Sequence, residues 1–102
     1  MRHKTKVAKH FKGVNWADAR DNFVDGWIIP SGINHELDSK YIQVEASYIL
    51  LQLINHLNIN TIRIGINNHT VLDYRWWHKY KSIIAAATGL DLNVILCCWE
   101  GV

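Results

Sequence analysis

The sequence predicts a single α/β domain built around a parallel β-sheet. Three short apolar segments, at residues 11–16, 60–67 and 93–99, have the composition of buried strands, and helical segments separate them. The order strand, helix, strand, helix, strand makes two successive βαβ crossovers, which join parallel strands. With 102 residues, 49% of them apolar, the chain suits one small folded domain and not a disordered one.

The connection after the first strand, at residues 17–37, is long for so small a domain. About twenty residues without clear periodicity are usually either functional or disordered. Several large apolar side chains favour order: Phe23, Trp27, Ile28 and Ile29. We therefore expect an ordered loop that lies over a site.

Two amphipathic helices are predicted between the strands. The first begins near Asp38 or Ser39, either of which can act as the N-cap. Its spacing of apolar residues predicts one inner stripe, formed by Ile42, Ala46, Ile49, Leu53 and Leu57. The second helix follows a polar turn at residues 67–70 and runs from about residue 73 to 88, with Gly89 as its C′ residue. Its predicted inner face consists of Trp77, Tyr80, Ile84 and Ala87.

The third strand is apolar throughout after Asn93. Such a run is typical of a strand covered on both faces. It includes the adjacent Cys97 and Cys98. A bond between neighbouring cysteines is strained and closes almost no loop, so we expect buried thiols and neither a disulfide framework nor a metal site.

Arg63 is the one charged residue in the second strand. A guanidinium on a buried strand is costly unless its donors meet acceptors, and its planar fork suits carboxylates. Ligands of parallel α/β folds bind at the carboxyl ends of the strands. Arg63 lies near such an end and shares its face with Gly65 and Asn67. We therefore expect an acidic group to face Arg63 within a site.

Charge and motifs narrow the classes of partner. The first twelve residues hold five of the eleven basic residues and no acidic one, which leaves six basic against nine acidic residues, or about −3. We interpret residues 1–10 as a basic leader, and the mild acidity of the remainder argues against a nucleic-acid partner. The histidines lack metal-ligand spacing, and no Gly-rich phosphate-binding or dinucleotide motif occurs. We expect no metal, no cofactor and no membrane segment, and the start lacks an ordinary secretory signal.

Three segments together resemble the first three βα units of the cellulase-type glycoside hydrolases of family 5, which are (β/α)8, or TIM, barrels. They are the G-V-N-W opening within residues 11–16 with residues 23–27, the N-T-I-R-I strand at residues 60–66, and the V-I-L strand running into residues 97–100. A full barrel takes about 250 residues. The resemblance therefore implies a partial TIM barrel, with residues 11–102 as the N-terminal part of a catalytic domain.

The resemblance also implies a function and a set of site residues. The family hydrolyses O-glycosidic bonds of β-linked polysaccharides or oligosaccharides by a retaining double displacement, which uses two Glu residues. These follow the fourth and seventh strands, so this chain alone is expected to be an inactive fragment. Arg63 matches the Arg that hydrogen-bonds the nucleophile. The implied substrate-binding residues are Asn15, Trp16, Asn67, Trp99 and Glu100. Trp99 stands where many members have a His, so the role of that His does not carry over.

Two alternatives remain open at this point. A non-catalytic carbohydrate-binding or degenerate barrel piece would stack sugars on Trp16, Trp27 and Trp99. A small flavodoxin-like domain would instead bind a partner through its surface. Open strand edges invite association, so we expect the fragment to self-associate. Family members are mostly secreted, yet no signal is visible, which leaves the compartment undetermined.

Overall fold

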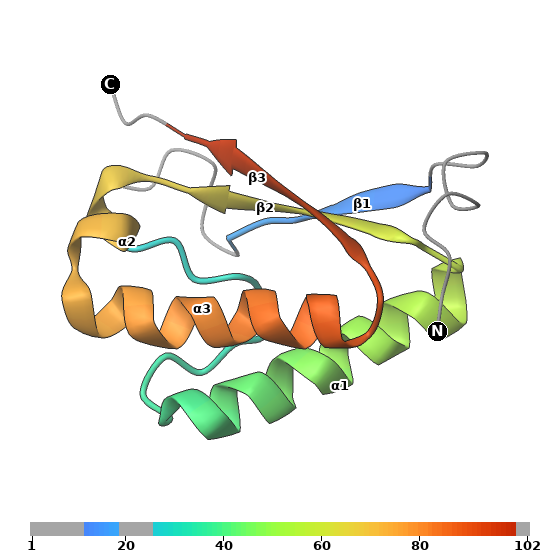
Figure 1. The fold of residues 1–102 in the computed structure, drawn as a ribbon, viewed down its shortest axis with the longest axis horizontal. Helices are drawn as coiled ribbons and strands as arrows, with labels where there is room; N and C mark the ends of the chain where they lie inside the picture. The colour runs from blue at the N-terminus through green and yellow to red at the C-terminus, as the bar shows by residue number, and fades with distance from the viewer. Residues whose placement is uncertain (1–11, 19–25, 100–102) are drawn as a thin grey trace.

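The computed structural model describes residues 12–18 and 26–99, and these form an α/β fold (Figure 1). The three strands are β1 (Gly13–Trp16), β2 (Thr61–Ile66) and β3 (Asn93–Cys98). The helices are α1 (Ser39–Leu57), α2 (Asn68–Leu72) and α3 (Tyr74–Gly89). The predicted class, a parallel sheet with helices between its strands, is confirmed.

The strands are parallel and follow one another across the sheet in the order β1-β2-β3. Arg63 in the centre of β2 is the register partner of Asn15 in β1 and of Ile95 in β3. Both long helices, α1 in green and α3 in orange, lie on the same face of the sheet (Figure 1). Helices on one face alone leave the other face of the described sheet uncovered.

The core lies between the sheet and the two long helices. Alternate residues of β2, Ile62 and Ile64, point into it and are fully buried. The helices contribute the remaining large buried side chains, among them Ile42, Leu50, Trp76, Tyr80 and Ile83. Full burial of one aliphatic side chain contributes roughly 1.5–3 kcal/mol, so this layer stabilises the fold.

The boundaries of α1 agree with the sequence, and its inner face differs at one end. Asp38 occupies the N-cap position, and Asn58 ends the helix in the left-handed conformation at φ 55°. Ile42 and Ala46 are buried as predicted, but Leu57 is 45% exposed. Leu57 was therefore wrongly placed in the core.

The inner face of α3 agrees with the prediction at Tyr80 and Ala87 and differs at the other two positions. Asp73 caps the helix by accepting a hydrogen bond from the Trp76 amide. Trp76 is 1% exposed, whereas Trp77 and Ile84 are half-buried. The left-handed residue after the helix is Asp91, at φ 66°, and Gly89 remains helical. The structure thus confirms Tyr80 and Ala87 on the inner face, replaces Trp77 and Ile84 there, and corrects the predicted C′ glycine.

Two expectations about the remaining segments were also wrong. The polar turn expected at residues 67–70 is the start of the short helix α2. The third strand is not covered on both faces, since Ile95 is 36% and Leu96 44% exposed. β3 forms one edge of the described sheet, and these two residues point to opposite faces, so the described elements leave both faces of β3 partly exposed there. Cys97 is half-buried and Cys98 exposed, so the expected burial of both thiols is wrong, and both thiols are free.

The long connection between β1 and α1 is ordered where the structure describes it. Asp18 and Pro30 form an antiparallel bridge, so the segment doubles back on itself. Ile28 is fully buried, and its amide donates to the Thr70 hydroxyl at 2.8 Å. The loop therefore packs against the start of the β2–β3 crossover. Within the described part of the chain, none of the helices is both long and apolar enough to cross a bilayer.

Candidate functional site

The carboxyl ends of the strands form a shallow cavity on the uncovered face of the sheet. Its volume is about 150 Å³, and its lining includes Asn15, Arg63, Gly65, Cys97 and Trp99. The parallel register brings these residues together, because Asn15 pairs with Arg63 and Gly65 with Cys97. Three of the predicted site residues, Asn15, Arg63 and Trp99, thus lie at one place.

Arg63 lies on this uncovered face and is exposed, which corrects the expectation of a buried guanidinium. One of its nitrogens donates to the Cys97 sulfur over 2.9 Å. Among residues 12–18 and 26–99, no carboxylate lines the cavity. The acidic partner expected from the sequence is therefore not among the described residues.

Trp99 packs against the backbone of Gly65 across the two strands. A Cβ added to Gly65 would lie 2.7 Å from Trp99 Cδ2 and Cε2, which is too close for real atoms. The Trp99 amide also donates to the Ile66 carbonyl at 2.7 Å. On the helix side, the buried Tyr80 hydroxyl donates to the Gly65 carbonyl. A glycine fits here because a Cβ would overlap the indole, while the hydrogen bond from Tyr80 uses only the backbone.

Trp16 lies in the core and not at the open cavity. Its side chain is 5% exposed, and its Nε1 donates to the Ser31 carbonyl at 2.8 Å. It follows Asn15 in β1, so it points to the opposite, helix-covered face of the sheet. Its described role is to pack the core and hold the loop before α1.

Asn67 is also buried, at 6% exposure, and both ends of its amide are occupied. Its oxygen accepts from the Thr70 amide at 2.9 Å, which caps α2, and its nitrogen donates to the Gly26 carbonyl at 2.9 Å. The amide therefore holds the loop and α2 together. Glu100, the last predicted substrate-binding residue, lies outside the described residues.

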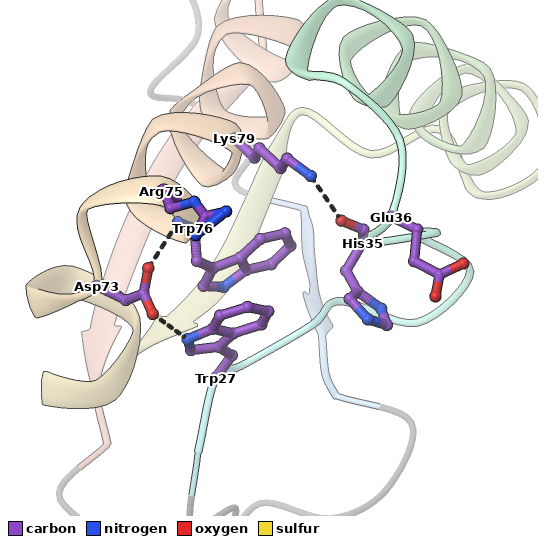
Figure 2. Close-up of a pocket in the computed structure, with 7 residues that line it drawn as sticks. All are labelled: Trp27, His35, Glu36, Asp73, Arg75, Trp76 and Lys79. Carbon is purple, nitrogen blue, oxygen red and sulfur yellow. Dashed lines mark hydrogen bonds between the residues drawn. The ribbon is translucent and has the colours of Figure 1, made fainter.

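A second and larger cavity lies between the loop before α1 and the first turns of α3 (Figure 2). Its volume is about 380 Å³. Trp27 stacks on Trp76 with a centroid distance of 5.3 Å, and His35 meets the two rings edge-on at 6.1 and 6.5 Å. Trp27, Trp76 and His35 thus form an aromatic wall of the cavity. The deeper ring, that of Trp76, also belongs to the core.

Charged groups surround this aromatic wall. Asp73 accepts from the Trp76 amide at 3.0 Å and from Trp27 Nε1 at 3.1 Å. The Trp76 hydrogen bond, aided by that from Trp27, holds the pKa of Asp73 below its usual range, and burial opposes this only in part. Lys79 reaches across the cavity and donates to the His35 carbonyl at 3.0 Å, as Figure 2 shows. The loop and α3 are therefore joined at both ends of the cavity.

Sequence reasoning missed this second cavity. The predicted site did not include His35, and Trp77 instead of Trp76 was placed inside. Asp73 was available as the N-cap, but an N-cap fixes where a helix begins and not which of its faces is buried. The contact of His35 with both indoles depends on the path of the loop, which no local pattern predicts.

Metal chemistry finds no support in the described part of the chain, where no group of three or more His, Cys, Asp or Glu side chains could hold an ion. The described cavities instead offer aromatic rings, a guanidinium and amide groups. Comparison with known proteins adds nothing to this geometry: no protein-family model, curated protein or solved structure matches the chain.

Proposed function

We propose that this chain provides the first three βα units of a retaining, cellulase-type glycoside hydrolase that cleaves β-linked glycans. The observation that carries the proposal is the position of Arg63. It stands near the carboxyl end of β2, on the face opposite the helices, with its guanidinium in a cavity beside Asn15 and Trp99. A guanidinium offers five donors, and one nitrogen of Arg63 contacts Cys97. The others are available to a carboxylate.

The topology supports a barrel origin over a flavodoxin-like one. A flavodoxin-like sheet has the strand order 2-1-3 and carries helices on both faces. Here the order is β1-β2-β3, and both long connecting helices cover one face (Figure 1). Successive units of a (β/α)8 barrel have this arrangement, with the uncovered face directed to the barrel interior.

The chemistry of the proposed site follows from these residues. Arg63 would orient a nucleophilic Glu from outside the described residues and keep it ionised, because a nearby cation lowers a carboxyl pKa. The nucleophile forms a glycosyl ester and expels the leaving sugar, and water then cleaves the ester. Asn15 can hydrogen-bond sugar hydroxyls, and the Trp99 indole offers a ring for stacking. Arg63 itself is a positioning residue.

A second candidate is carbohydrate binding without catalysis. It is favoured by one observation: within the described residues, the cavity at the strand ends has no carboxylate lining it. Such a site could hold a sugar by hydrogen bonds and stacking and would leave its bonds intact.

The experiment that separates these candidates uses the product of the complete reading frame. We expect the frame to encode a fourth strand followed by Asn-Glu and a seventh strand followed by Glu. Its purified product should release reducing ends from a soluble β-glucan. Binding of the glucan without release would favour the second candidate. A product that neither binds nor cleaves β-linked glucan, xylan or mannan would overturn both.

A further inference from the structure

The helix α1 carries a second apolar stripe on the side opposite its buried residues. The buried residues are Ile42, Ala46 and Leu50. On the other side, four large apolar residues form the outer stripe and are exposed: Tyr41 by 53%, Val44 by 68%, Tyr48 by 65% and Leu51 by 41%. The last three line one shallow groove of about 430 Å³. Single exposed apolar residues are ordinary, whereas a contiguous apolar patch indicates an interaction surface.

The outer stripe has the spacing of a coiled-coil seam. Its residues follow one another at intervals of three, four and three, so Tyr41 and Tyr48 occupy a positions and Val44 and Leu51 occupy d positions of two heptads. The fold already uses the other side of α1 to cover the sheet, and a and d residues pack best against a second helix. We propose that α1 pairs in parallel with α1 of a second copy of this chain.

The charges beside the outer stripe favour a second copy in the parallel orientation. In the same heptad frame, Lys40 is a g residue and Glu45 is the next e residue. In a parallel pair, each g residue faces the next e residue of the partner helix, so Lys40 and Glu45 would meet twice across the two-fold axis. An antiparallel pair that kept the stripe in contact would instead bring the two Glu45 carboxylates close together.

Both charged groups lie where such a pair needs them. The Lys40 nitrogen is 5.2 Å from the centroid of the Tyr41 ring, so the ammonium lies beside the outer stripe. One oxygen of Glu45 accepts from the Asn34 amide at 2.8 Å, which holds the carboxylate at the opposite flank. A carboxylate has about four lone-pair sites, so this bond leaves capacity for a lysine.

The outer stripe is short, so the dimer is expected to be weak. Two heptads bury little area compared with a stable interface, and we expect a Kd on the order of 10–100 μM. The folded domain already holds α1 in its helical form, which removes the cost of ordering it on association. This surface is distinct from the strand edges and from the Arg63 cavity. The inference therefore does not rest on the proposed hydrolase.

The first test is sedimentation equilibrium of the 102-residue protein at concentrations from about 1 to 300 μM. We expect a reversible equilibrium between monomer and dimer. Tyr48→Glu places a charge in the seam and should raise the Kd at least about tenfold. The matched control is Tyr74→Glu, which adds the same charge at a tyrosine of α3 that is 86% exposed. The control should leave the Kd unchanged.

A charge exchange tests the partner and its register. Lys40→Glu and Glu45→Lys should each weaken the dimer, because each replaces an attraction across the interface with a repulsion. An equimolar mixture of the two variants should associate more tightly than either alone, because every facing pair then has opposite charges.

Disulfide trapping tests the orientation, with Cys97 and Cys98 both replaced by serine. Asn55 is exposed and occupies the next a position. In a parallel pair, Asn55→Cys faces itself across the seam and should form a disulfide between the two copies. In the antiparallel pair the two positions would lie about 27 Å apart along the axis. His56→Cys, at the next exposed position and off the seam, is the control and should remain unlinked.

Several results would overturn the inference. These are a monomer at every concentration, an equal effect of Tyr48→Glu and Tyr74→Glu, no gain on mixing the charge variants, and equal trapping at positions 55 and 56. Association that persists in Tyr48→Glu would place the contact at the strand edges instead. Failure of the hydrolase proposal would leave these association results unaffected.

Discussion

Gly65→Ala is the substitution whose effect the structure specifies most closely. The new methyl carbon would lie 2.7 Å from two atoms of the Trp99 indole, so the indole must move away. Overpacking of this kind costs roughly 1–3 kcal/mol. Alanine in place of glycine within a strand returns roughly 0.5–1 kcal/mol, because the unfolded chain loses freedom. We expect a net destabilisation of about 1–2 kcal/mol.

A double-mutant cycle isolates this contact. Urea unfolding followed by circular dichroism gives the free energy of unfolding of the wild type, Gly65→Ala, Trp99→Ala and the double variant. Without the indole, Gly65→Ala should be neutral or stabilising by about 0.5–1 kcal/mol. An equal destabilisation in the presence and absence of the Trp99 indole would refute the reasoning, because the cost would then have another source.

Three further predictions concern hydrogen bonds that hold the loop and helices. Asp73→Asn keeps a capping oxygen and removes a carboxylate whose pKa is lowered in the folded protein. The variant should therefore have a lower free energy of unfolding than the wild type above pH 3.8, and the difference should disappear as the pH falls below that value. Asn67→Ala removes a buried cap and the bond to the Gly26 carbonyl, and should cost about 2 kcal/mol in urea unfolding at pH 7. Burial, aided by a nearby carboxylate, raises the pKa of Tyr80, so the free energy of unfolding of the native protein should fall above pH 10. In Tyr80→Phe this fall above pH 10 should be smaller. The same substitution should lower the free energy of unfolding by about 1 kcal/mol at pH 7, because it removes the hydrogen bond to the Gly65 carbonyl.

The elements of the fold could be predicted because local signals agree with tertiary packing. Asp38 and Asn58 mark the ends of α1, where a capping position and a left-handed residue bound an apolar stripe. The alternation along β2 places Arg63 and Gly65 on one face and the core isoleucines on the other. The parallel direction of the strands also followed from the two crossovers, whereas their order β1-β2-β3 is known only from the structure.

Burial was less predictable because it depends on which surfaces are covered. The apolar run in β3 suggested two covered faces, yet Ile95 and Leu96 are substantially exposed in the described structure. The composition of a strand indicates that its residues favour burial. It does not show which other element, if any, covers them. The uncovered face of this sheet agrees with a proposal in which further strands complete the fold.

Some residues of the candidate sites could be predicted from the sequence, and others could not. Asn15, Arg63 and Trp99 could be grouped from sequence, because parallel strands bring their carboxyl ends to one edge. The sequence predicted Asn67 in the same group. In the structure its side-chain amide instead caps α2. The pairing of Trp27 with Trp76 joins residues far apart in the chain, and only the folded loop brings their rings together.

The most direct test of the central claim is the effect of Arg63→Met on hydrolysis of a soluble β-glucan by the product of the complete reading frame. If Arg63 positions the nucleophile, kcat should fall about 100-fold while KM stays near the wild-type value. In the 102-residue chain the same change should alter the free energy of unfolding by less than about 0.5 kcal/mol, because the guanidinium is exposed. An unchanged kcat in an active product would contradict the role assigned to Arg63.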